Sequence, residues 1–194
     1  MTSTPRRAGI AGTLRRTEDG KGAVRMEDLY DTDTEDLWSA LTDPRRMARW
    51  IADVEGDLRP GGRIHARFTS GWDGPGRIDV CEAPHRLAVT MSPGTPGQTV
   101  IEVTLAPDRG RTRLIVEERG IPLAELPSHG AGWHAHVEDL AAHIHGGQAG
   151  DCTAVSASRL FHHCPAACLA VLLRFLPIEP GTNRPYLCQI SQPA

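Results

Sequence analysis

The feature that most constrains the fold is a run of short segments in which apolar and polar residues alternate. Their apolar positions are Ile64, Ala66 and Phe68; Ile78 and Val80; Leu87, Val89 and Met91; Ile101, Val103 and Leu105; and Leu114 and Val116. A period of two indicates strands with one buried face and one wetter face, as in an antiparallel sheet. This parity places Cys81 on the wetter face, beside Arg77 and Asp79. Turn sequences rich in Gly and Pro separate the segments.

Shorter patterns precede these strands. Residues 12–16 and 23–30 flank the turn signal Glu18-Asp19-Gly20 and predict an N-terminal hairpin. Residues 31–42 predict a helix, because Thr32 and Glu35 have the spacing of a capping box. A second short helix is expected from Asp43-Pro44, because Pro is tolerated at the first helical position.

A longer helix is expected between residues 122 and 146, with its main part beginning near Gly132. Its apolar residues, which include Trp133 and Val137, share one face. A strongly curved sheet has a concave apolar face that needs a cover, and this helix supplies the long apolar stripe. A gap where helix and sheet diverge is a natural cavity for a small molecule.

Several segments resemble one protein family. They are LWSALTDPRRMARWIADVEGDLRPGGRI (37–64), GRIDVCEAPHRLAVT (76–90), TVIEVTL (99–105), TRLIVEERG (112–120) and GWHAHVEDLAAHI (132–144). They are similar to the AHSA1-like branch (activator of Hsp90 ATPase homologue-like) of the helix-grip, START/Bet v 1-like SRPBCC superfamily. The resemblance covers about residues 12–146. It implies an α+β helix-grip fold: a curved antiparallel sheet wrapped on a long C-terminal helix, with two short helices after the first strands. It does not choose a function, because the superfamily hosts carriers, cyclases, hydrolases and regulators.

The chain divides into three parts: a mobile N-terminus (1–11), the helix-grip domain (12–148) and an atypical C-terminal tail (149–194). The tail holds four of the five cysteines, carries few charges and has no family match. We expect it to be poorly ordered or loosely docked. The apolar run 164–177 is interpreted as a membrane-surface helix, a helix docking on the body, or an unselected, for example frameshifted, terminus. A metal site at His162, His163, Cys164 and Cys168 lacks a supporting second Cys pair.

Composition narrows the class of partner. A net charge of -3 provides no basic field for nucleic acid. No apolar run approaches the ~20 residues of a membrane-spanning helix, so stable membrane insertion is not expected. The N-terminal segment is too interrupted for a signal peptide, which predicts a cytoplasmic protein. We expect a small apolar molecule as partner, no cofactor, and leave a homodimer open.

The predicted cavity wall consists of Trp50, Phe68, Trp72, Met91, Trp133 and Val137, with Glu118 and His136 as polar contacts. Trp72 follows a glycine in a loop, so ligand contact and packing of the loop over the core remain equal alternatives. Glu118 has the inward parity, and a buried carboxylate would have a raised pKa. The alternative, a strand end where parity no longer implies burial, is favoured.

The histidines of the last helix are expected to be flanking residues of a partly exposed helix rather than a metal site. His134 and His136 point in different directions, and His136 and His143 are separated by about 10.5 Å of helical rise. No phosphate-binding loop or nucleophile elbow is present, so catalytic residues stay unknown. The leading hypothesis is binding of a small hydrophobic or aromatic molecule between the curved sheet and the long helix. The alternatives are an enzyme with cyclase- or hydrolase-type acid–base chemistry in the same cavity, and an Hsp90-activator-like protein-interaction module.

Overall fold

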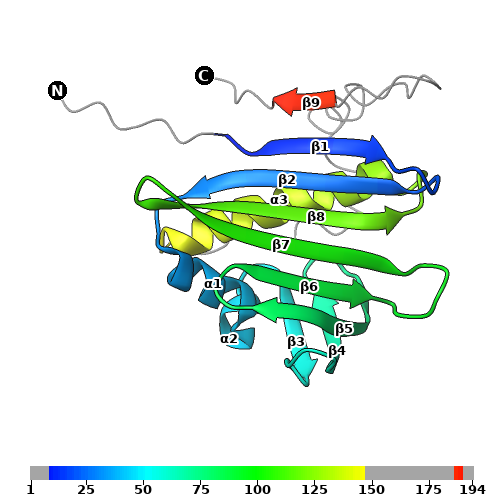
Figure 1. Cartoon of the computed structure of the whole chain (residues 1–194), viewed down its shortest axis with the longest axis horizontal. Coiled ribbons are helices and arrows are strands. Elements are labelled where there is room, and N and C mark those ends of the chain that lie inside the picture. Colours follow the sequence, from blue (N-terminus) through cyan, green and yellow to red (C-terminus); the bar gives the residue numbers. More distant parts are fainter. Residues whose placement is uncertain (1–8, 147–185, 190–194) are drawn as a thin grey trace.

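The structure is a computed structural model that describes residues 9–146 and 186–189 (Figure 1). Its elements are β1 (Ala11–Arg16), β2 (Gly22–Tyr30), α1 (Thr34–Thr42), α2 (Pro44–Met47), β3 (Ala52–Gly56), β4 (Arg63–Phe68), β5 (Asp73–Glu82), β6 (Arg86–Met91), β7 (Thr99–Asp108), β8 (Arg111–Ile121), α3 (Leu126–Ile144) and β9 (Tyr186–Gln189).

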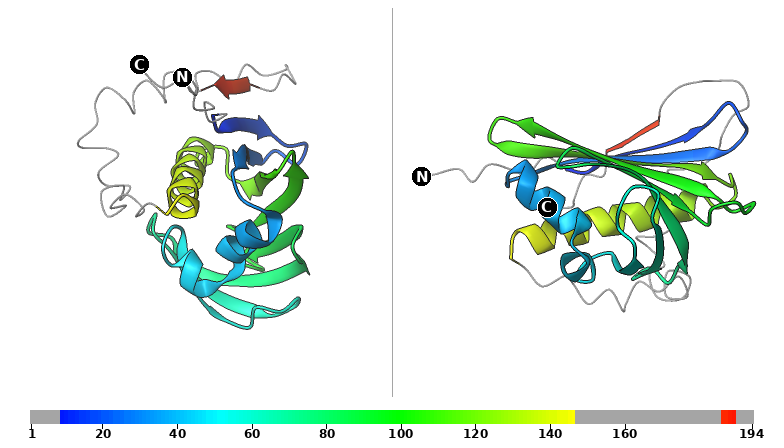
Figure 2. Two further views of the ribbon diagram at one scale, coloured as in Figure 1. Left: turned by 90° about the vertical axis from the view of Figure 1, so that its left-hand side faces the viewer. Right: turned by 60° about the horizontal axis from the view of Figure 1, so that its bottom comes forward.

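The strands form one antiparallel sheet in the order β3-β4-β5-β6-β7-β8-β2-β1-β9. The sheet bends around α3, and α1 and α2 close one end of the resulting trough (Figure 2). This arrangement confirms the expected α+β helix-grip fold. The five alternating segments correspond to β4 to β8, and the N-terminal hairpin corresponds to β1 and β2.

The sequence pattern does not predict β3. Within Ala52–Gly56 only Ala52 is buried, because the strand lies at the edge of the sheet and carries Asp53 and Glu55 on its exposed positions. A strand with so few apolar positions gives almost no periodic signal. Charged residues on an edge strand also oppose unwanted pairing with other chains.

The long helix begins at Leu126, six residues before the expected main part at Gly132. Gly130 lowers the helical signal of this first stretch, but a tertiary contact requires it. A Cβ at Gly130 would lie 2.9 Å from Leu14 Cδ2 on β1. The glycine therefore lets the first turns of α3 approach β1 closely.

The predicted capping box at Thr32 and Glu35 is wrong by one residue. Asp33 caps α1, and its Oδ1 accepts a hydrogen bond from the Asp36 amide at 2.7 Å. The Thr32 hydroxyl donates to Asp36 Oδ2 at 2.7 Å instead. The predicted start of α2 at Pro44 is confirmed, with Asp43 as its cap.

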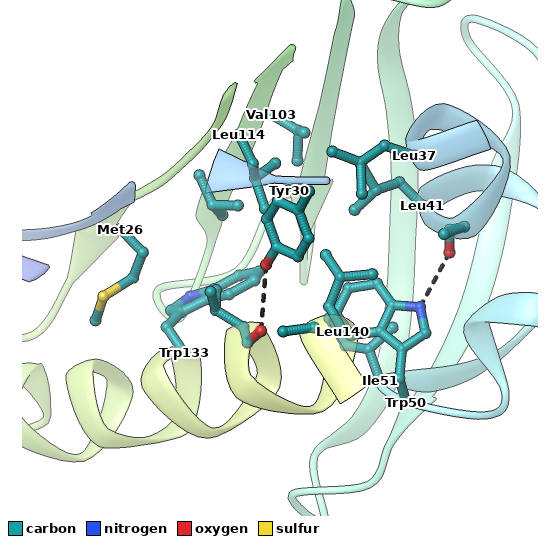
Figure 3. Close-up of a cluster of buried hydrophobic side chains, with 14 of the residues drawn as sticks. Met26, Tyr30, Leu37, Leu41, Trp50, Ile51, Val103, Leu114, Trp133 and Leu140 are labelled. Atoms are coloured by element: carbon teal, nitrogen blue, oxygen red, sulfur yellow. Dashed lines mark hydrogen bonds between the residues drawn. The ribbon is translucent and has the colours of Figure 1, made fainter. Parts of the chain in front are cut away.

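The main core lies between α3 and the concave face of the sheet (Figure 3). On α3, Val137 and Leu140 are almost fully buried. The Tyr30 hydroxyl donates to the Val137 carbonyl at 3.2 Å, which ties β2 to the middle of the helix. The helix thus has a fixed position over the sheet.

The tail contributes β9, which pairs with β1 from Ala11↔Gln189 to Leu14↔Tyr186. The possible metal site at residues 162–168 lies outside the described residues, and so does the apolar run 164–177. Most of the predicted mobile N-terminus, residues 1–8, lies outside them as well. Among the helices that are described, none has the length and apolar character needed to cross a bilayer.

Candidate functional site

A cavity of about 120 Å³ lies between the concave face of the sheet and the helices. Strands β3 to β8 supply one wall, and α1, α2 and α3 supply the other. Alternation of side chains along the strands explains the composition of the first wall, because every second residue of the central strands points inward. Ile64, Val89, Ile101 and Val116 are among these residues.

Five of the predicted wall residues line the cavity: Trp50, Phe68, Met91, Trp133 and Val137. Their role in ligand contact remains a prediction. Three other predicted contacts, Trp72, Glu118 and His136, lie outside the lining. Each of the three instead supports a residue of the wall.

Trp72 packs over the core beside the cavity. Its ring meets Phe68 edge to face, with centroids 5.6 Å apart. A Cβ at Gly74 would lie 2.9 Å from the indole, so the absent side chain makes room for it. Packing of the loop over the core is therefore the arrangement found, and Trp72 acts by holding Phe68.

The side-chain N–H and O–H groups of the wall already have partners within the protein. Trp50 Nε1 donates to the Ala40 carbonyl at 3.0 Å (Figure 3). Trp133 Nε1 donates to Glu118 Oε2 at 2.7 Å. The Thr42 hydroxyl donates to the Trp38 carbonyl at 2.8 Å. The cavity therefore presents aliphatic groups, aromatic rings and the Cys81 thiol rather than free N–H or O–H donors.

The alternation pattern predicts Cys81 on the outer face, and this prediction is wrong. The register between β5 and β6 shifts between Ile78 and Val80, so that Cys81 lies opposite Leu87. Leu87 faces the cavity, and Cys81 lines it as well. A β-bulge adds one residue to a strand and reverses the parity that follows it. A strict alternation pattern cannot reveal this.

The favoured interpretation of Glu118 as a strand-end residue is also wrong. Glu118 lies within β8 and is only 6% exposed. Burial opposes its ionisation, but hydrogen bonds and the charge of His129 hold the pKa of this carboxyl below its usual value, with help from Trp133 and Thr99. The alternative prediction, a raised pKa of Glu118, takes only burial into account and omits these partners.

His136 is buried on α3 between two rings of the wall. Its ring centroid lies 5.9 Å from that of Phe68 and 6.0 Å from that of Trp133. Burial lowers the pKa of His136 to about 4, although a hydrogen bond involving the Trp50 backbone acts in the opposite direction. His136 is therefore a neutral packing residue at neutral pH.

Within residues 9–146 and 186–189, no three His, Cys, Asp or Glu residues are arranged to hold a metal ion. The described cavity lining also contains no carboxylate and no imidazole. Leu58, in the β3–β4 connection, is 39% exposed and lines the cavity. This residue marks a side on which the cavity approaches solvent.

Comparison with known proteins agrees with this architecture. Residues 31–145 match the family described as "Activator of Hsp90 ATPase homolog 1-like protein". The chain belongs to this AHSA1-like family. The family is part of the SRPBCC, or Bet v 1-like, superfamily, so the predicted resemblance is confirmed. No curated protein matches the chain.

Solved structures show the same AHSA1-like architecture. The crystal structure of CalU16 from Micromonospora echinospora is 27% identical, with a TM-score of 0.60, over 79% of this chain and 92% of that one. The solution structure of CalU16 has 25% identity and a TM-score of 0.66, over 88% and 91% of the two chains. DynU16, described as a protein in the dynemicin biosynthetic locus, is 27% identical with a TM-score of 0.60. That match covers 66% of this chain and 48% of DynU16.

Proposed function

We propose that this AHSA1-like protein binds a small, neutral, hydrophobic or aromatic molecule in the cavity between the curved sheet and α3. The observation that carries the proposal is the chemistry of the wall. Both indole N–H groups that border the cavity donate to protein oxygens. A ligand therefore gains affinity by burying apolar surface, at about 25 cal/mol per Å².

The size of the cavity limits the ligand. An engineered protein cavity of about 150 Å³ with a similar aliphatic and aromatic lining stays dry and binds benzene. A cavity of about 120 Å³ therefore suits a molecule with one ring. Larger ligands require movement of the wall. Such movement loses the fewest packing contacts on the side of Leu58, because this residue is partly exposed.

One further observation supports a small-molecule partner, and two others weigh against the alternative functions. A relative at 27% identity comes from a biosynthetic locus. Acid–base catalysis would need a titratable group facing the ligand, whereas Glu118 and His136 lie behind the described lining. A protein-interaction module would need an exposed apolar patch, and in the described residues Leu58 is the single large exposed hydrophobic side chain.

The test compares three molecules of similar size: toluene, benzoate and benzylamine. Calorimetric titration is expected to show saturable binding of toluene and binding of the two charged molecules that is weaker by roughly a hundredfold, because the wall offers no partner for a buried charge. Equal binding of toluene and benzoate would contradict the proposal, and so would the absence of toluene binding.

Cys81 provides an internal control for the location. Its thiol lines the cavity, so bound toluene should slow its alkylation by iodoacetamide. Mass spectrometry of the peptide containing Cys81 separates this thiol from the cysteines of the tail. Toluene binding that leaves the alkylation rate of Cys81 unchanged would place the ligand elsewhere.

A further inference from the structure

The indole of Trp133 is held by a carboxylate that lies outside the cavity. Glu118 Oε2 accepts hydrogen bonds from Trp133 Nε1 at 2.7 Å and from His129 Nδ1 at 2.9 Å. Trp133 is a residue of the cavity wall, whereas Glu118 and His129 do not line the cavity. One buried oxygen thus connects the wall to a partly exposed charged group.

We propose that Glu118 is the positioning residue of the cavity: by fixing the Trp133 indole, it sets the shape of the space in which the ligand binds. This inference rests on the proposed function and adds the residue that controls affinity without touching the ligand. The hydrogen bond accounts for the control, because an indole N–H without an acceptor would leave a buried donor unsatisfied. The ring would then turn toward another acceptor and change the wall.

The surroundings of Glu118 favour a charged and fixed carboxylate. Glu118 lies on β8 opposite Val24 of β2 and Ile101 of β7, so neither strand places a second charge beside it in the register. From α3, His129 supplies the nearby charge, and Thr99 on β7 contributes a further hydrogen bond. His129 Nε2 also lies 3.8 Å from the exposed Glu125. The Glu118–His129 pair supports the charge on the acceptor.

Three variants separate positioning from simple stability. Glu118→Gln keeps the size of the side chain and one acceptor oxygen. Glu118→Leu removes the acceptor. Glu117→Gln is the matched control, because the neighbouring side chain points to the opposite face and pairs with Arg15 and Arg119. Toluene affinity is measured without denaturant, at a pH at which each variant is fully folded. The indole Nε1–H signals are recorded by NMR, and the variant Trp133→Phe assigns the signal of Trp133.

We expect affinity to fall in the order wild type, Glu118→Gln, Glu118→Leu, with Glu118→Leu weaker by roughly tenfold or more, and no change in Glu117→Gln. The Trp133 indole signal should move in both Glu118 variants without ligand. Should Glu118→Leu fail to fold, Glu118→Gln carries the test. Unchanged affinity in a destabilised Glu118 variant would overturn the proposal, because it would reduce Glu118 to a structural residue.

The Trp133 indole signal without ligand distinguishes failure of the positioning role of Glu118 from failure of the proposed function. If wild-type protein binds none of the three molecules, the proposed function is rejected. A Trp133 signal that moves in the Glu118 variants without ligand still supports the positioning of the indole. A Trp133 signal that stays in place in Glu118→Gln overturns the positioning role whether or not toluene binds.

Discussion

Glu117 and Glu118 are neighbours on β8 and carry the same chemical group, but they face opposite sides of the sheet. Glu117 lies on the convex face, where its Oε1 pairs with Arg15 at 2.8 Å and Arg119 at 3.3 Å. Glu118 lies on the concave face, where it accepts from Trp133 and His129 in a largely buried cluster. The comparison shows that the face of the sheet, rather than the residue type, decides what a carboxylate does here.

The same contrast extends over the whole sheet. On the convex face, a series of ion pairs crosses three strands: Arg86 to Glu102 at 2.8 Å, and Glu102 to Arg119 at 2.7 Å. Water can replace such pairs at little cost. On the concave face, apolar residues and paired polar atoms leave a space of about 120 Å³. We therefore expect changes on the concave face to have large effects and changes on the convex face to have small ones.

The largest expected effect on stability is that of Glu118→Leu. It leaves the buried Trp133 N–H and the partly exposed His129 ring without their shared acceptor. The loss of both hydrogen bonds, each to a charged carboxylate, costs about 3 kcal/mol or more. Glu117→Leu should cost about 1 kcal/mol or less, because its arginine partners remain hydrated. Urea denaturation of both variants measures the two values. Similar losses would refute the distinction between the faces.

The next prediction concerns pH and His136. The pKa of His136 is about 4 in the folded protein because of burial, and about 6.5 in the unfolded chain. The unfolded chain therefore binds a proton first, so the contribution of His136 is fully present above pH 6.5 and is lost as the pH falls toward 4. This loss amounts to about 3 kcal/mol.

The measurement compares urea denaturation of wild type and His136→Phe between pH 7 and pH 4.5. The phenyl ring of the variant keeps the packing against Trp133 and Phe68 but does not titrate. The stability of His136→Phe should therefore change much less over this pH interval than that of the wild type. Parallel curves for the two proteins would show that His136 is not neutral and buried in the folded state.

A third prediction concerns the space itself. Val89→Phe adds a ring to a residue that lines the cavity, and it should weaken toluene binding by roughly tenfold or more, at a stability cost of about 1–3 kcal/mol. Val100→Phe on β7 is the control, because Val100 lies next to the inward-facing Ile101 and outside the lining. Calorimetry on both variants gives the answer. Equal affinities would mean that toluene occupies another site.

The smallest expected effect belongs to the convex face. A double-mutant cycle on Glu102 and Arg119, each changed to Ala, should give a coupling energy below about 1 kcal/mol. This value should decrease further when salt is raised from 0.1 to 1 M. A coupling energy above 2 kcal/mol that is insensitive to salt would mean that the convex face is as sensitive as the concave face.

The sequence predicts the fold more completely than it predicts the site. The alternating strands follow from a period of two, and the apolar face of α3 follows from the helical spacing of residues such as Trp133 and Val137. The N-terminal hairpin follows from the turn signal Glu18-Asp19-Gly20. The edge strand β3 has too few apolar residues to be seen. Helix α3 lies within the expected range 122–146, but it begins at Leu126 rather than near Gly132. Gly130 weakens the local helical signal, and only its close approach to Leu14 explains a glycine there.

Site residues that follow strand alternation can be predicted from the sequence. Site residues whose positions depend on tertiary contacts cannot. Phe68 and Met91 follow from alternation, and they line the cavity. Cys81 requires the bulge in β5, which no residue pattern announces. The position of Glu118 needs the partner His129, eleven residues away on a different element. A pKa argument made from burial alone therefore had the wrong sign.

The most direct test of the central claim is methyl NMR during titration with toluene. The account predicts saturable shifts confined to inward-facing methyl groups, such as those of Val89, Ile101 and Leu140, which line the cavity. Methyl groups on the convex face, such as those of Val100 and Ile115, should stay unchanged. Shifts that do not saturate, or that appear on the convex face, would contradict the existence of a ligand-binding cavity under α3.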